Sequence, residues 1–113
     1  MKFKNVFYGV SNMEETVEFY EKVLGLPLLF VDRNQWAQFN VDGVSFALGG
    51  PEEVPEDLTG GAVVTFEVDD LKETKKTLEK NGIKVSDIRD MGSHGKTCSF
   101  YDPAKNIVQL YQK

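Results

Sequence analysis

Residues 12–25 read N-M-E-E-T-V-E-F-Y-E-K-V-L-G and predict a capped helix. Asn12 and Glu15 have the spacing of a capping box, in which the first side chain accepts an N–H of the first turn and the glutamate reaches back. Gly25 ends the pattern, as glycine does where a chain turns into the left-handed conformation. One face is predicted to be buried because apolar side chains recur at helical spacing. These are Met13, Val17, Tyr20 and Leu24.

The same pattern returns in the second half of the chain, at an offset of 58 residues. Asp70 and Glu73 take the positions of the first capping box, and Gly82 is the terminating glycine. The strand-like runs are residues 6–10, 28–32, 36–41 and 44–48 in the first half and 63–68, 84–90, 97–101 and 106–112 in the second, with Asp42-Gly43 as a hairpin turn. The sequence therefore predicts one domain, residues 1–113, with two strand-helix-strand-strand-strand modules (1–48 and 62–113) and a Gly/Pro-rich linker (49–61).

Composition excludes several classes of protein. The chain has 113 residues, of which 41% are hydrophobic, which is enough for a single core. The net charge of −5 argues against a nucleic-acid partner, whose phosphates would be repelled. No apolar run is long enough for a membrane span. Cys98 is the single cysteine and cannot form an intrachain disulfide, so we expect a cytoplasmic location.

Alternation along the strands separates two faces. One face is apolar and is predicted to receive the helices, with Cys98 and Phe100 on it. The other face carries aromatic and uncharged polar groups, a composition typical of small-molecule sites. Its members include Trp36, Gln38, Ser45, Thr65, Glu67, Gln109 and Tyr111. The alternative is an ordinary half-exposed sheet face.

Two motifs resemble those of the vicinal oxygen chelate superfamily, the group of glyoxalases, bleomycin-resistance proteins and extradiol dioxygenases. The first is F-Y-x-x-V-L-G, beginning at Phe19 after Asn12, and the second is F-x-D-P-x-x-N, beginning at Phe100. The resemblance spans the whole chain. It implies an α+β fold of two βαβββ modules whose curved mixed sheets surround a cavity, and it implies a homodimer. One departure is Lys105, at a position that the family commonly fills with glycine.

The resemblance also implies where a metal would be held. Metal-dependent members take His, Gln or Glu ligands from the first and last strands of each module. The aligned positions here are Asn5, Ala47, Val63 and Gln109. Ala47 and Val63 have no donor atom, and a catalytic divalent site needs about three strong protein ligands. Shifting the alignment by two residues, which brings Phe7 to the first position, supplies no histidine or carboxylate. We therefore expect no metal and no other cofactor.

The favoured hypothesis is a metal-independent small-molecule-binding protein that resembles antibiotic-sequestering resistance proteins. Its ligand would be aromatic or cationic. The predicted ligand-binding residues are Asn5, Phe7, Trp36, Gln38, Ser45, Thr65, Glu67, His94, Gln109 and Tyr111. The alternative is a lyase, isomerase or dioxygenase of the same superfamily with an atypical or metal-free site, in which Glu67 or His94 would act as acid or base. His94 lies in a loop, and an ordinary exposed loop histidine is the favoured interpretation of this residue.

Overall fold

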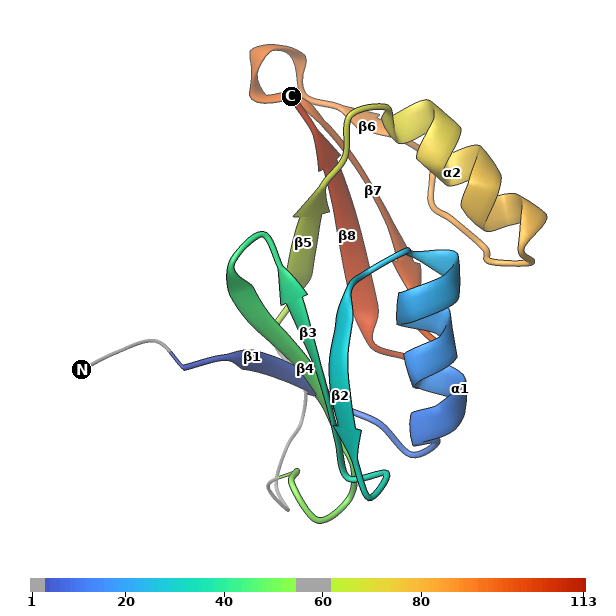
Figure 1. Ribbon diagram of the computed structural model, residues 1–113. Helices are drawn as coiled ribbons and strands as arrows, with labels where there is room; N and C mark the ends of the chain where they lie inside the picture. The colour runs from blue at the N-terminus through green and yellow to red at the C-terminus, as the bar shows by residue number, and fades with distance from the viewer. Residues whose placement is uncertain (1–3, 55–61) are drawn as a thin grey trace. The chain divides into compact units, whose positions relative to one another are not determined.

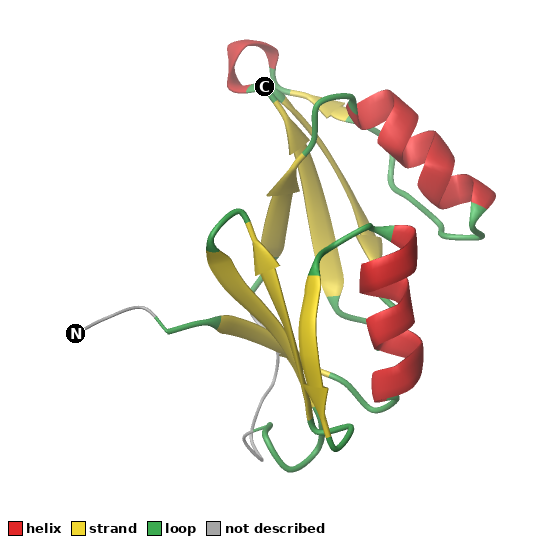
Figure 2. Ribbon diagram, viewed as in Figure 1, coloured by secondary structure: helices red, strands yellow, loops and turns green. Residues whose placement is uncertain are grey.

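The protein consists of two βαβββ modules, each with a four-stranded mixed sheet and a helix on one face (Figures 1 and 2). The computed structural model describes residues 4–54 and 62–113. The chain is divided into two compact units, residues 1–59 and 60–113. The predicted α+β fold is confirmed, whereas the cavity implied by the resemblance stays a prediction. Residues 55–61, most of the predicted linker, lie outside the described residues. No helix in the described ranges is long and apolar enough to cross a membrane.

The first sheet has the strand order β1-β4-β3-β2. Its strands are β1 (Val6–Gly9), β2 (Leu28–Asp32), β3 (Trp36–Val41) and β4 (Val44–Gly49). β1 is parallel to β4, and the other pairs are antiparallel. Asp42 and Gly43 have φ angles of 52° and 79°, which is the geometry of the predicted two-residue hairpin. Gly49, predicted as the first linker residue, belongs to β4 instead.

The first helix is less regular than predicted. α1 (Met13–Glu18) begins as expected, because Asn12 Oδ1 accepts a hydrogen bond from the Glu15 N–H at 3.1 Å. It then continues as a short π-helix, η1 (Phe19–Val23), in which the Leu24 N–H donates to the Phe19 carbonyl at 3.1 Å. The wider turn buries two consecutive aromatic residues, Phe19 and Tyr20. The buried stripe is therefore Met13, Thr16, Phe19 and Tyr20, whereas Val17 and Leu24 are only half-buried.

An aromatic core joins this helix to the sheet. The ring of Tyr20 lies 5.1 Å from that of Phe46 and 6.1 Å from that of Phe39, and the latter two are 5.9 Å apart. All three are fully buried, together with Ala37 and Leu48. The apolar face of β3 and β4 therefore receives the helix, as predicted. Burying an aromatic or aliphatic side chain of this size stabilises a fold by about 1.5–3 kcal/mol.

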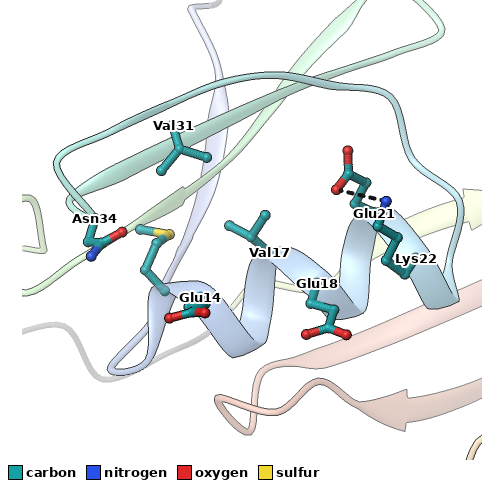
Figure 3. Close-up of a pocket in the computed structure, with 8 residues that line it drawn as sticks. Glu14, Val17, Glu18, Glu21, Lys22, Val31 and Asn34 are labelled. Carbon is teal, nitrogen blue, oxygen red and sulfur yellow. Dashed lines mark ion pairs between the residues drawn. The ribbon is translucent and has the colours of Figure 1, made fainter.

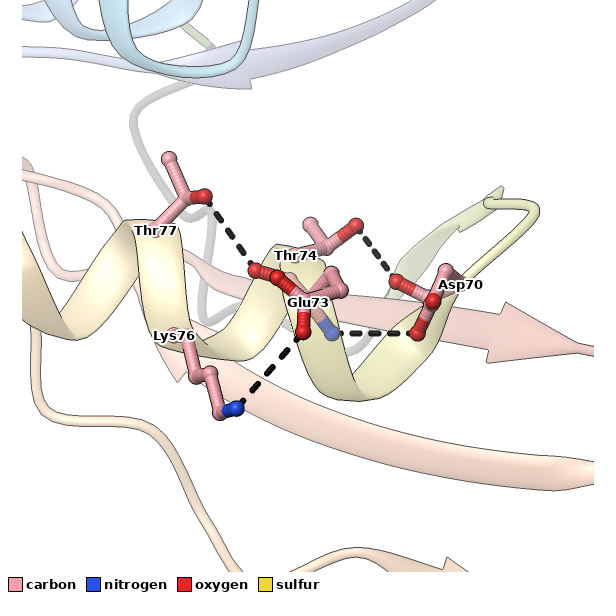
Figure 4. A network of polar contacts seen from close by, with 5 residues as sticks. All are labelled: Asp70, Glu73, Thr74, Lys76 and Thr77. Carbon is pink, nitrogen blue, oxygen red and sulfur yellow. Dashed lines mark hydrogen bonds and ion pairs between the residues drawn. The ribbon is translucent and has the colours of Figure 1, made fainter.

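The second sheet has the order β5-β8-β7-β6. Its strands are β5 (Val64–Glu67), β6 (Arg89–Asp90), β7 (Lys96–Tyr101) and β8 (Ile107–Gln112), and α2 (Leu71–Lys80) contacts β7 and β8. Figure 4 shows the start of α2, where Asp70 Oδ1 accepts from the Glu73 N–H at 3.1 Å and the Asp70 carbonyl accepts from Thr74 Oγ1 at 2.9 Å. The predicted N-cap bond is confirmed, whereas the Glu73 carboxylate does not reach back to Asp70 and instead lies 3.6 Å from Lys76 Nζ. Gly82 ends the helical region with a φ of 80°.

The predicted strand at residues 84–90 is wrong for residues 84–88, because only Arg89 and Asp90 form ladder pairs. Ser86 explains the difference. Its N–H donates to the Ser99 carbonyl at 2.9 Å, but its hydroxyl, not its carbonyl, accepts from the Ser99 N–H at 2.9 Å. The Ser86 carbonyl instead accepts from Lys75 Nζ at 3.0 Å. A side-chain bond therefore replaces the second ladder bond at this point.

Asp102 organises the turn between β7 and β8. Its buried carboxylate accepts from the N–H groups of Ala104 and Asn106, both at 2.8 Å, and from Asn106 Nδ2 at 3.0 Å. Lys105 has a φ of 68°, the left-handed conformation that favours glycine. The Asp102 bonds explain how the turn holds a lysine at this position.

Candidate functional site

The face of each sheet opposite its helix, here called the distal face, carries the predicted site residues other than His94. In the first module the register places Phe7 and Gln38 on either side of Ala47, and Trp36 opposite Gly49. Residues directly paired in this way project from the same face. β1, β3 and β4 therefore bring together side chains that are far apart in the sequence.

Three side chains form a half-buried cluster on the distal face of the first module, here called the Trp36 cluster: Phe7, Trp36 and Gln38. The rings of Phe7 and Trp36 have centroids 5.0 Å apart at an angle of 60°. Trp36 Nε1–H donates a hydrogen bond to Gln38 Oε1 at 3.1 Å. Gly49 makes room for the cluster, because a β-carbon added there would lie 3.0 Å from the Phe7 ring.

Asn5 and Ser45 lie at the edge of the same face. Asn5 is half-buried and precedes Phe7 by two residues, which is the spacing of one strand face. Ser45 is half-buried and pairs with Asn40. The Asn40 side chain has a structural role, since its Oδ1 accepts from the Gly43 N–H at 3.0 Å. The structure brings Asn5 and Ser45 to the distal face without a direct bond to the Trp36 cluster among the contacts described.

Phe30 also reaches this face, and sequence reasoning missed it. Leu28 pairs with Phe39, but Phe30 pairs with Gln38, so Leu29 is an extra residue in a β-bulge. Simple alternation would place Leu28 and Phe30 on the same face, whereas the bulge turns Phe30 to the distal face beside Gln38. Phe30 is 49% exposed. The run of apolar residues in β2 carries no alternation from which its phase could be predicted.

The distal face of the second module is more polar. Thr65 pairs with Gln109, and Gln109 Nε2 donates to Thr65 Oγ1 at 3.0 Å. Glu67 pairs with Tyr111 and lies 3.9 Å from Lys113 Nζ in an exposed ion pair. The Tyr111 ring packs on Gly95, where an added β-carbon would lie 2.6 Å from Tyr111 Cε1.

Two further residues that were not predicted from the sequence lie in line with Tyr111 across the strands of this sheet. Thr97 pairs with Tyr111, and Arg89 pairs with Thr97.

His94 lies apart from these strands. It ends the short 3-10 turn η2 (Gly92–His94) and is exposed. Glu67 is likewise exposed. Neither residue sits in an environment that singles it out as an acid or base, and their assignments stay predictions.

The residues present do not fit a divalent-metal centre. Ala47 is fully buried and lies between Phe7 and Gln38 in the sheet, and the Gln109 amide donates to Thr65. No three His, Cys, Asp or Glu side chains cluster anywhere within residues 4–54 and 62–113. Cys98 is buried on the helix-facing side, as predicted, and desolvation raises the pKa of its thiol despite the opposing effect of Lys75. We derive no metal-dependent step for this site.

A separate hollow of about 350 Å³ lies on the other side of β2, against α1 (Figure 3). Val17 and Val31 point toward each other across it, whereas Glu14 and Glu18 point outward from the helix. Glu21 and Lys22 at its end form an ion pair of 3.7 Å. The hollow contains none of the predicted site residues. Its acidic side chains are those of an ordinary solvated helix face, so we assign it no function.

Comparisons with known proteins agree with this architecture. The model of the Glyoxalase/Bleomycin resistance protein/Dioxygenase superfamily matches residues 2–110. A probable trivalent organoarsenical cleaving enzyme of Bacillus subtilis (strain 168) is 34% identical over 87 residues, which are 73% of this chain and 58% of that protein. This chain therefore spans little more than half of that relative.

Many solved structures share the fold, among them the following two. Lactoylglutathione lyase from Agrobacterium tumefaciens has a TM-score of 0.82 at 19% identity, covering 98% of this chain and 92% of that one. The antibiotic binding protein TnmS3 from Streptomyces sp. CB03234 has a TM-score of 0.75 at 23% identity, covering 99% and 98%. The motifs, the two βαβββ modules and the family match lead to one conclusion: the chain belongs to the Glyoxalase/Bleomycin resistance protein/Dioxygenase superfamily.

Proposed function

We propose that this protein binds a small aromatic molecule without a metal, on the distal faces of its modules. The observation that carries the proposal is the Trp36 cluster, in which two half-buried aromatic rings contact each other and one of them is hydrogen-bonded to an amide. Aromatic side chains that are not fully covered by the fold retain ring surface for stacking, and such contacts contribute about 0.5–1.5 kcal/mol beyond simple burial. A few placed polar groups among apolar walls are typical of ligand sites.

The distal face of the second module carries proposed ligand-binding groups of its own. Thr65 and Gln109 offer hydrogen bonds, Tyr111 an aromatic surface, and Glu67 a partner for a cationic group. Asn5, Ser45 and His94 complete the proposed set. The similarity to TnmS3 supports a binding role, because that protein shows that this fold can serve as an antibiotic binding protein.

Isothermal titration with a panel of aromatic antibiotics tests the proposal. The protein is first dialysed against a chelator and checked for metal by elemental analysis. We expect saturable binding by the metal-free protein and about a two- to tenfold loss of affinity in Trp36→Ala, from the size of one aromatic contact. Glu18→Ala is the matched control, because Glu18 lines the hollow beside α1. A loss of affinity in Glu18→Ala with Trp36→Ala unaffected would move the ligand to that hollow and overturn the proposal.

A cleaving enzyme is the second candidate function, favoured by the relative at 34% identity. The burial of Cys98 argues against it for an arsenical substrate, since thiols bind soft metal centres as thiolates and desolvation raises the pKa of this thiol. Incubation with a trivalent organoarsenical, with and without added divalent metal, tests this candidate. The protein would be established as an enzyme if it formed product and if Glu67→Gln or His94→Gln abolished that product formation.

We also propose a homodimer, the commonest symmetric assembly. Light scattering at micromolar concentration should give twice the chain mass of 12.7 kDa. A 12.7 kDa species would contradict it.

A further inference from the structure

The Trp36 cluster provides a stacking surface and also fixes the direction in which the Gln38 side-chain amide points. The indole Nε1–H is a hydrogen-bond donor only, so its partner on Gln38 must be the amide oxygen. With the oxygen held at 3.1 Å from Trp36, the Nε2 group of Gln38 points away from the indole. The chemistry of the indole donor therefore decides which end of the Gln38 amide is the oxygen.

The two N–H donors on Gln38 Nε2 have no acceptor among residues 4–54 and 62–113. Gln38 is half-buried, with Phe7 and Trp36 on one side and Phe30, its direct partner on β2, on the other. No buried side-chain nitrogen or oxygen among the described residues lacks a partner, so these donors are open to solvent, where a ligand acceptor could take the place of water.

We propose that Gln38 is the specificity-determining residue of the site and selects aromatic ligands that carry a hydrogen-bond acceptor, such as a ring-attached carbonyl. The inference rests on the proposed binding function and names its ligand class. A ring system stacks on the aromatic side chains, and its acceptor oxygen receives a hydrogen bond from Gln38 Nε2. A ligand that presents a donor at the same point meets another donor and is disfavoured.

A pair of matched probes tests this selection. 2-Acetylnaphthalene and 2-ethylnaphthalene have the same ring and a two-carbon substituent at the same position, but only the first has a carbonyl oxygen. Binding is followed by two-dimensional ¹⁵N–¹H NMR of the labelled protein. We expect the carbonyl probe to bind about three- to tenfold more tightly, the value of one neutral hydrogen bond. It should also shift the Gln38 side-chain amide signals, which 2-ethylnaphthalene should leave nearly unchanged.

Three variants separate the donor from the ring. Gln38→Glu keeps an acceptor for the Trp36 N–H but has no donor at neutral pH, so the preference for the carbonyl probe should disappear or reverse. Gln38→Leu should remove the preference without weakening 2-ethylnaphthalene. Trp36→Phe keeps a ring but frees the amide, so the preference should shrink.

Each remaining outcome decides against a different part of the account. Equal binding of both probes to the unmodified protein would overturn the role of Gln38 and leave the stacking site intact. A carbonyl preference that survives Gln38→Leu would assign the donor to another residue. Absence of binding by either probe up to its solubility limit would contradict the stacking site itself, and the proposed function with it.

Discussion

Trp36→Ala and Phe39→Ala, compared side by side, test whether the two faces of the first sheet differ as described. Phe39 is fully buried against Tyr20 and Phe46, and removing such a side chain costs about 3–5 kcal/mol of unfolding free energy. Trp36 is half-buried and makes two specific contacts. The Phe7 ring contact is worth about 0.5–1.5 kcal/mol. The hydrogen bond to Gln38 adds about the same amount.

These values give a loss of roughly 1–3 kcal/mol for Trp36→Ala, about half of the loss for Phe39→Ala. The assay is urea unfolding followed by far-ultraviolet circular dichroism, because Trp36→Ala removes the only tryptophan fluorophore. Both substitutions lie in the first module, so the same transition reports them even if the modules unfold separately. A loss for Trp36→Ala that equals or exceeds that for Phe39→Ala would show that Trp36 is a core residue and would refute the reasoning.

Three further predictions follow from local geometry. Asn12→Ala and Asp70→Ala should each lower the unfolding free energy by about 1 kcal/mol in urea titrations, because each removes the acceptor of a helix N-cap. Gly95→Ala should lower the unfolding free energy more than Gly43→Ala in the same assay, although both glycines have positive φ. A β-carbon added at Gly95 would lie 2.5 Å from the Gln112 carbonyl oxygen, whereas one added at Gly43 would meet open space. Equal losses of unfolding free energy would contradict this. Desolvation raises the pKa of the Cys98 thiol in the folded protein, so its contribution to stability is fully present below the unfolded-state pKa and is lost as pH rises through the raised folded-state pKa. Thiol labelling in native buffer should accordingly be slow and should become fast in denaturant, and fast native labelling would show that the thiol is accessible.

Local chemistry made much of the fold predictable. The caps at Asn12 and Asp70, the left-handed glycines and the Asp42-Gly43 hairpin depend on neighbours within a few residues, and all of them occur in the structure. Period-two alternation also identified which side of β3 and β4 is buried. These signals are strong because each reflects one backbone requirement that few residue types meet.

The sequence does not reveal features that depend on an inserted residue or on a tertiary bond. The π-helix at Phe19–Val23 and the bulge at Leu29 each shift the phase of a regular element by one position, and no local motif announces either shift. Ser86 breaks a predicted strand through a side-chain bond to Ser99, a partner 13 residues away. In the candidate site, Phe30 was a residue that the sequence did not predict, because its position beside Gln38 depends on the bulge.

Ligand binding to the chelator-treated protein, mapped by NMR, is the most direct test of the central claim. The ligand is an aromatic antibiotic that binds in the titration screen. The account predicts saturable shifts of the Trp36 indole N–H, the Gln38 side-chain amide and the Phe7 backbone signal, with an affinity that added zinc or iron does not change. Binding that disappears on chelation and returns with a divalent metal, or shifts confined to the hollow around Val17 and Val31, would contradict it.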